Sequence, residues 1–189
     1  FLLILHGGPG YPFYPDIAEE YPYLQLEHLF NVVYWEQRGT GKSYSARISH
    51  KSMNTERFVK DIREVVDFIS DNFHQDKIYL WGHSWGSNIG MKYAARYPET
   101  LHAYFGTGQS VNPLRNEKNA YEAMLRKAKK HDDTKMLNDL LEIDTADYQL
   151  RDALKVRDWM YKYGGIEYKV RFKQAYAGKS ELNKILKTP

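Results

Sequence analysis

The sequence of 189 residues contains no cysteine, and this absence excludes several kinds of site. Without thiols the chain has no disulfide framework, no Cys-rich metal centre and no thiol nucleophile. The sequence also lacks any apolar run near the ~20 residues that span a membrane, and it shows no charged-then-apolar signal peptide. A soluble, cytoplasmic protein is therefore the expectation, with no membrane as a partner.

An excess of one charge sign is also lacking. The formal net charge is +3 at pH 7, too small to indicate a nucleic-acid partner or an anionic membrane surface. The charge is uneven along the chain, because residues 113–189 carry 17 Lys and Arg against 12 Asp and Glu, whereas residues 1–112 carry 10 against 12. This change predicts a domain boundary near Pro113.

A serine flanked by glycines lies between a predicted strand and a predicted helix. Residues 77–81, KIYLW, have the length and apolar character of a buried strand, and residues 87–97 have a helical pattern. Between them, residues 82–86 read GHSWG, which fits Gly-x-Ser-x-Gly in its strand–turn–helix context. The alternative interpretation is an ordinary glycine-rich turn.

The motif suits a serine nucleophile. A side chain that projects from so tight a turn leaves no room for a Cβ at Gly82 or Gly86. Ser84 is therefore the candidate nucleophile. The backbone N–H of Trp85, at the start of the helix, would point to where an oxyanion develops.

A second glycine-rich loop follows the predicted strand at residues 1–5, FLLIL. Residues 6–10 read HGGPG, and their unencumbered N–H groups can approach a ligand closely, although a plain turn is the alternative. His6 has no second ligand at metal spacing. We expect it to bond the loop backbone rather than to bind a metal or act as a base, and we expect no metal or cofactor.

A third loop, residues 36–43 with the sequence EQRGTGKS, follows a predicted strand at residues 31–35. It differs by one residue from the phosphate-binding P-loop, which requires glycine where Glu36 stands. The negative charge of the Glu36 carboxylate would repel a phosphate. Residues 44–54 are polar and show no helical periodicity, so no helix dipole is expected to bind a phosphate there. Nucleotide binding is therefore not expected.

The predicted elements alternate between strand and helix. Further strands are predicted at residues 31–35 and 102–106, a partial helix within residues 17–30, and a long helix over residues 55–73 with Thr55 as N-cap. The long helix carries one apolar stripe: Phe58, Ile62, Val65, Val66, Ile69 and Phe73. This order predicts an α/β fold, a mostly parallel sheet with helices on both faces and ligand loops at the carboxyl ends of its strands.

After Pro113 the pattern is helical. Helices are predicted over residues 116–131, 134–143 and 147–163, the last stopped by glycines at 164 and 165. Helices that follow a strand of an α/β core are typical of a lid. The predicted organisation is thus an α/β core at residues 1–112 and a partial helical cap at residues 113–189.

With these three loops in this order, the chain resembles the α/β-hydrolase superfamily and, within it, the prolyl iminopeptidase-like branch. The HGGPG loop, the QRGTGKS stretch and a Trp directly after the serine carry the likeness, which covers residues 1–112. The resemblance implies that Ser84 attacks a carbonyl carbon and that the N–H groups of Gly8 and Trp85 hold the oxyanion. It gives supporting roles to six further residues: His6, Gly7, Gln37, Arg38, Gly82 and Gly86.

Two departures from the branch leave the substrate open. Glu36 stands where the branch usually has Asp, and His83 stands where it often has Gly. The resemblance also implies an acid and a histidine after the cap, yet only His102 and His131 follow Ser84. We therefore expect the fold to be incomplete at both ends, with the catalytic Asp and His beyond Pro189.

An incomplete triad predicts that this chain alone is nearly inactive. An incomplete sheet has an unpaired edge, through which copies could associate. The favoured function is a serine hydrolase that forms an acyl-enzyme, of prolyl iminopeptidase type, acting on small peptides or amides. An esterase, lactonase or acyltransferase acting on esters remains open, as does a non-catalytic binding module that lost its triad.

Overall fold

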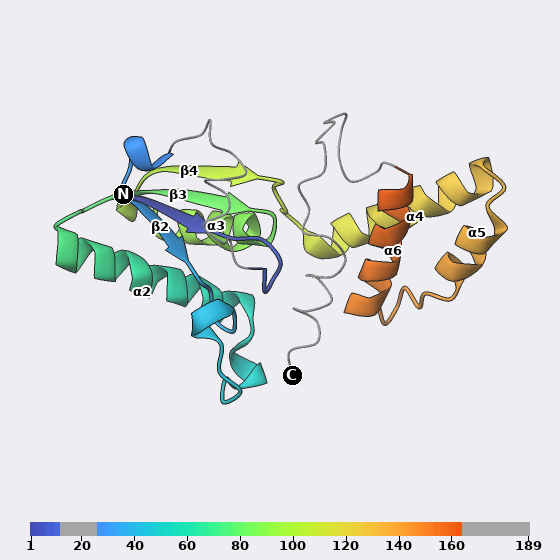
Figure 1. The fold of residues 1–189 in the computed structure, drawn as a ribbon, viewed down its shortest axis with the longest axis horizontal. Coiled ribbons are helices and arrows are strands. Elements are labelled where there is room, and N and C mark those ends of the chain that lie inside the picture. Colours follow the sequence, from blue (N-terminus) through green and yellow to red (C-terminus); the bar gives the residue numbers. More distant parts are fainter. Residues whose placement is uncertain (12–25, 164–189) are drawn as a thin grey trace. The chain divides into compact units, whose positions relative to one another are not determined.

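The computed structural model describes residues 1–11 and 26–163, which belong to two compact units, Phe1–Pro113 and Leu114–Pro189. From β2 onward the strands and helices of the first unit alternate, and short 3-10 turns lie in some of the connections (Figure 1). In chain order they are β1 (Leu2–Leu5), η1 (Leu26–His28), β2 (Val32–Trp35), η2 (Gly41–Ser43), η3 (His50–Ser52), α2 (Thr55–Phe73), β3 (Ile78–His83), α3 (Trp85–Arg96), η4 (Pro98–Thr100) and β4 (Leu101–Thr107).

The strands form one parallel sheet in the order β2-β1-β3-β4, which confirms the α/β class predicted from the sequence. Leu5, at the end of β1, pairs with Trp35 on one side and Gly82 on the other, and Gly82 pairs with Gly106. The carboxyl ends of neighbouring strands therefore meet at one edge. Within the described residues β2 and β4 are the outer strands, and association of copies through their edges stays a prediction.

The core of this unit lies between the sheet and two helices. All four residues of β1 are buried, as expected for a central parallel strand. Leu3 and Leu5 pack with apolar residues of α2 and α3, among them Ile62, Ile89 and Tyr93. Because Leu3 and Leu5 point to one face of β1 and pack with both helices, α2 and α3 cover the same face of the sheet, and they also contact each other. The partial helix predicted at residues 17–30 falls mostly outside the described residues, which contain only the turn η1 at its end.

Local boundaries differ from the prediction where polar groups decide them. The helix α2 has the predicted bounds, but its N-cap is Asn54 rather than Thr55, because the Asn54 Oδ1 accepts from the N–H of Arg57 at 2.9 Å. Strand β3 continues to His83, and α3 begins at Trp85, two residues earlier than predicted. Ser84 alone separates them.

The second unit is helical in its described part. Its helices are α4 (Pro113–Lys130), which begins at the last residue of the first unit, α5 (Thr134–Leu141) and α6 (Leu150–Lys162). Helix α4 begins earlier than predicted, since proline suits the first helical position. Helix α6 begins later, at Leu150, where the Asp152 carboxylate accepts from the N–H of Gln149 at 2.9 Å. The predicted stop at residues 164–165 lies outside the described residues.

This second unit has its own apolar core, formed by Met124, Ala128, Met136, Leu140, Ile143, Val156 and Trp159. The Asp133 side chain caps α5 by accepting from the N–H of Met136 at 3.0 Å. Hydrogen bonding to the Tyr163 hydroxyl and to that N–H lowers the pKa of Asp133 to about 2. Across residues 1–11 and 26–163, none of the helices combines the length and apolar character needed to cross a bilayer.

Candidate active site

The backbone of Ser84 has a conformation that side-chain-bearing residues rarely adopt. Its φ is 51° and its ψ is −116°, directly between β3 and α3. Such a conformation costs on the order of 1–3 kcal/mol and persists only where surrounding contacts enforce it. Here the Ser84 N–H donates to the Thr107 carbonyl at 2.8 Å, and the Ser84 carbonyl accepts from the N–H of Ser87 at 3.0 Å.

The two glycines of the motif are required by close backbone contacts. A Cβ at Gly82 would lie 2.5 Å from the carbonyl oxygen of Gly86. A Cβ at Gly86 would overlap the carbonyl oxygen of Leu5, on the neighbouring strand β1. The turn around Ser84 therefore depends on main-chain atoms packing against main-chain atoms.

The loop after β1 borders the serine. A Cβ at Gly7 would lie 3.3 Å from the Cβ of Ser84 and 3.3 Å from Cδ2 of His83. Gly8 has a φ of 118°, and a Cβ there would lie 2.5 Å from the N of Gly10. Two loops far apart in the sequence, residues 6–10 and 82–86, thus meet at the carboxyl edge of the sheet.

His6 is buried and bonds the backbone of two loops. Its Nδ1 lies 2.9 Å from the Gly7 carbonyl, and its Nε2 lies 3.2 Å from the N–H of Gln37. Because an N–H can only donate, Nε2 is the acceptor and Nδ1 carries the proton. Burial lowers the pKa of His6, which favours this neutral form. His6 is thus a loop-bonding histidine, as the sequence predicts.

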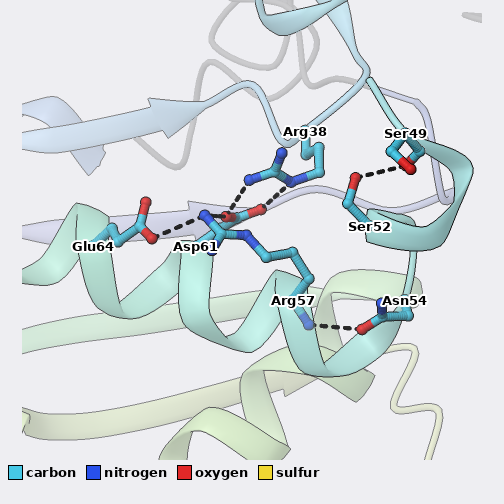
Figure 2. Close-up of polar contacts among 7 residues, drawn as sticks. All are labelled: Arg38, Ser49, Ser52, Asn54, Arg57, Asp61 and Glu64. Carbon is cyan, nitrogen blue, oxygen red and sulfur yellow. Dashed lines mark hydrogen bonds and ion pairs between the residues drawn. The ribbon is translucent and has the colours of Figure 1, made fainter. Parts of the chain in front are cut away.

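Gln37 and Arg38 follow β2 and hold different partners. The buried Gln37 amide bonds the His6 carbonyl and the indole N–H of Trp85. Arg38 donates Nε and one terminal nitrogen to both oxygens of Asp61 on α2, at 2.8 and 2.7 Å (Figure 2). This paired geometry raises the pKa of the Arg38 guanidinium. Arg38 therefore ties its loop to α2.

The carboxylate of Asp61 is shared by two guanidinium groups. Arg57 lies 2.7 Å from the same carboxylate and 2.8 Å from the carboxylate of Glu64, which is two turns beyond Arg57 on α2 (Figure 2). Only 7% of the Asp61 side chain is exposed, whereas 64% of the Glu64 side chain is. Asp61 is the centre of this ion-pair network.

The loop that resembles a P-loop is occupied by its own carboxylate. The Glu36 Oε2 accepts from the N–H of Lys42 at 2.6 Å, and a Cβ at Gly41 would overlap the Glu36 carboxylate. The Gly41–Ser43 segment is a single 3-10 turn and not the start of a long helix. In a phosphate-binding loop the backbone N–H of the lysine would be available to the phosphate. Here the Glu36 carboxylate accepts from that N–H instead.

Thr107, the last residue of β4, and the loop that follows it also support the serine turn, and sequence reasoning did not identify them. The Thr107 hydroxyl accepts from the indole N–H of Trp81 at 2.9 Å and lies 3.1 Å from Nδ1 of His83. Ser87 donates its hydroxyl to the Ser84 carbonyl at 2.6 Å and accepts from the N–H of Ser110 at 2.9 Å. The polar sequence TGQS at residues 107–110, directly after a predicted strand, is the signal that could have placed this loop at the carboxyl edge.

The two histidines that follow the motif lie elsewhere. His102 is near the start of β4, where β3 and β4 begin to pair, and its ring packs on Tyr79 with centroids 5.1 Å apart. It is therefore at the opposite end of the sheet from Ser84. His131 belongs to the second unit and packs on Tyr163. In residues 1–11 and 26–163, no three His, Asp or Glu side chains gather as a metal site.

A strand, a strained serine and a helix, in this order on a parallel sheet with glycines at both flanks, are the features of the α/β-hydrolase class. The family model described as alpha/beta hydrolase fold matches residues 1–184, and the chain belongs to this family. Among solved structures, one titled "Crystal structure of VinJ" shares the fold with a TM-score of 0.52 and 17% identity, over 87% of this chain and 60% of that one.

Curated relatives are similar over part of their length. The chain is 44% identical over 122 residues to "Probable aminopeptidase YbaC" of Bacillus subtilis (strain 168), covering 64% of this chain and 37% of that protein. It is 36% identical over 106 residues to "Proline iminopeptidase" of Chitinophaga pinensis, covering 54% of this chain and 32% of that protein. The matched stretch thus spans about a third of the length of these relatives.

Proposed function

We propose that the protein is a serine hydrolase in which Ser84 is the nucleophile, and that it is an aminopeptidase of prolyl iminopeptidase type. The observation that carries the proposal is the backbone of Ser84, whose φ of 51° and ψ of −116° put a non-glycine residue in a rare conformation between β3 and α3. Strained residues concentrate at functional sites, and this strain projects the hydroxyl from the carboxyl edge of the sheet.

In the proposed reaction, the Ser84 hydroxyl attacks the carbonyl carbon of the substrate and passes its proton to a histidine base. The N–H groups of Gly8 and Trp85 stabilise the oxyanion, helped by the dipole of α3. The protonated base gives its proton to the amine nitrogen as the C–N bond breaks, which leaves the acyl group on Ser84. The base then takes a proton from a water molecule that attacks the acyl carbonyl, and returns it to the Ser84 oxygen as the ester bond breaks and the acid product leaves. We propose that this base and its acid partner come from the part of the whole protein that its relatives carry beyond the matched stretch.

The proposed substrate is a small peptide or amide with a free N-terminus. This choice rests on the relatives named aminopeptidase and proline iminopeptidase. We propose further that the helical unit from Leu114 onward is a cap that selects the substrate. The boundary between the two units at Pro113 supports the separate role.

Fluorophosphonate labelling of the full-length protein, with the adduct mapped by mass spectrometry, tests the nucleophile. The expected result is a single adduct at Ser84 and none in the Ser84→Ala variant. Turnover by that variant should fall by about 10⁴-fold or more, because the catalytic groups act as a unit. A wild-type protein that is folded and does not label at Ser84 would exclude the serine hydrolase and favour a binding module.

The substrate class needs a second comparison. Full-length protein is assayed with an aminoacyl arylamide and with an aryl ester of the same acyl group. Hydrolysis of the arylamide, lost on blocking the substrate's free amine, is the result expected of an aminopeptidase. Turnover of the ester alone would retain the Ser84 nucleophile and replace the peptidase assignment with an esterase.

A further inference from the structure

The buried amide of Gln37 joins three segments that are distant in sequence. Its Nε2 donates to the His6 carbonyl at 2.9 Å, and its Oε1 accepts from the indole N–H of Trp85 at 3.1 Å. Its backbone N–H donates to the ring of His6. The residue is 1% exposed, so water does not compete for these bonds.

The chemistry of the partners fixes the orientation of this amide. A backbone carbonyl can only accept and an indole N–H can only donate, so the amide oxygen must face Trp85 and the nitrogen must face His6. No apolar side chain of similar size can meet both demands. An amide is thus required at this position by the two groups it bonds.

Both partners belong to segments with a proposed oxyanion donor. The His6 carbonyl starts the loop that contains Gly8, and the indole belongs to Trp85 itself. The Gln37 amide therefore spans from one donor segment to the other, and its length sets their separation. The position of Gln37 is fixed in turn, because its carbonyl accepts from the Thr40 hydroxyl at 2.7 Å and the adjacent Arg38 is bonded to Asp61.

We propose that Gln37 is a positioning residue that sets the distance between the N–H groups of Gly8 and Trp85. The proposal rests on the function proposed above, in which these two groups hold the oxyanion. Gln37 itself touches neither the reacting atoms nor Ser84 in the contacts described. Its effect should appear in the chemical step, because oxyanion donors act where negative charge develops.

The test compares kcat and KM of the full-length protein with those of Gln37→Leu, Trp85→Phe and the double variant. Trp85→Phe removes the indole donor and leaves the backbone N–H in place. Loss of one oxyanion donor costs about 10²–10³-fold in kcat, and displacement should cost somewhat less, about 10–100-fold, with KM nearly unchanged. The double variant should be no slower than Gln37→Leu alone, because that substitution already removes the bond to the indole, which is the bond that Trp85→Phe removes.

Gln37→Glu adds a measurement, the pH dependence of the labelling rate, that should not change if Gln37 only contributes to stability. The introduced carboxylate can still accept from Trp85 but repels the His6 carbonyl, whereas the protonated carboxyl can donate to it. The ratio of variant to wild-type labelling rate should therefore rise as the pH falls. Thr100→Val is the control, because Thr100 is buried on Tyr93, near the other end of β4, and its loss should reduce stability without changing the labelling rate of the folded protein.

The outcomes separate the two proposals. A folded wild type that fails to label at Ser84 overturns the hydrolase itself. A wild type that labels, with Gln37→Leu and Trp85→Phe at unchanged rates, leaves the hydrolase in place and overturns the role of Gln37. Independent, multiplying losses in the double variant, or a flat pH ratio for Gln37→Glu, would also overturn it.

Discussion

The two units differ in how much they rely on contacts between backbone atoms. Ten of the 13 glycines precede Pro113, and residues 114–163 contain none. In the first unit the glycines let main chain pack on main chain, as Gly86 does against Leu5. In the second unit side chains such as Met136 and Leu140 fill the core. Both units depend on the size of their buried side chains, but only the first is also intolerant of any added atom at a few backbone positions.

The largest expected effect is that of Gly86→Ala. The added Cβ would overlap the Leu5 carbonyl oxygen, which belongs to a central strand and cannot move aside. We expect a loss of more than about 4 kcal/mol, the range of exceptional substitutions, and no cooperative thermal unfolding transition. Gly10→Ala is the control, because its Cβ would meet nothing within 4 Å and only the φ of 90° opposes it. Normal stability of Gly86→Ala would show that the backbone packing is not as tight as described.

Leu140→Ala tests the side-chain core of the second unit. Leu140 is 0% exposed, so its truncation should cost about 2–5 kcal/mol through lost burial and the cavity left behind. Its neighbour Leu141 is 63% exposed, and Leu141→Ala should change stability by less than about 0.5 kcal/mol. Amide hydrogen exchange should show faster exchange confined to α4, α5 and α6 in Leu140→Ala. Faster exchange throughout β1 and β3 would contradict the independence of the two cores.

Asp61→Asn tests a buried side-chain contact of the first unit, the carboxylate shared by Arg38 and Arg57. The substitution leaves Arg38 and Arg57, both partly buried, without the carboxylate they share, and we expect a loss of about 2–3 kcal/mol in chemical denaturation. The matched control is Glu64→Gln, which removes an exposed pair with the same Arg57 and should cost less than about 0.5 kcal/mol. Equal losses in the two variants would mean that the burial of Asp61 is unimportant.

The smallest expected effect is a dependence of stability on pH through His6. Burial lowers the pKa of His6 in the folded state below its ordinary value of 6.5. As the pH falls below 6.5, the unfolded chain binds a proton that the folded protein does not, so stability decreases.

His6→Asn retains a side-chain N–H that could donate to the Gly7 carbonyl and does not titrate in this range. The stability advantage of the wild type over this variant should therefore shrink as the pH falls below 6.5, measured as the difference in urea midpoints. Burial also lowers the pKa of His83, but that contribution is common to both proteins and cancels. An advantage that stays constant with pH would show that His6 is not kept neutral by the fold.

Periodic patterns predicted most of the fold. The apolar stripe of α2 gave its bounds, and the apolar runs gave the strands, because these features repeat along the sequence itself. Single side-chain bonds decided what was missed, such as the N-cap at Asn54 and the start of α6 at Leu150. Such boundaries depend on which of several adjacent polar residues reaches the helix end.

The glycine-flanked serine was recognisable because its pattern is local, but the contacts around it are not. Gln37 bonds groups 31 and 48 residues away, and Asp61 bonds Arg38 from a different element. These contacts follow from the register of β1 with β2 and β3, and the periodic patterns of the sequence do not predict that register. The contacts of Thr107 and of the loop after it were missed for the same reason, although the position of these residues after a predicted strand was visible in the sequence.

The Glu36 carboxylate that bonds the Lys42 amide has a consequence for how sequences of this kind are classified. One nucleotide change can turn a glutamate codon into a glycine codon, and here it would complete the pattern GxxxxGKS. A pattern search would then report a nucleotide-binding protein, although the turn at Gly41–Ser43 leads to no helix of its own. A single substitution of Glu36 by glycine could therefore lead to a wrong family assignment, although the loop would still lack the helix that a phosphate-binding loop needs.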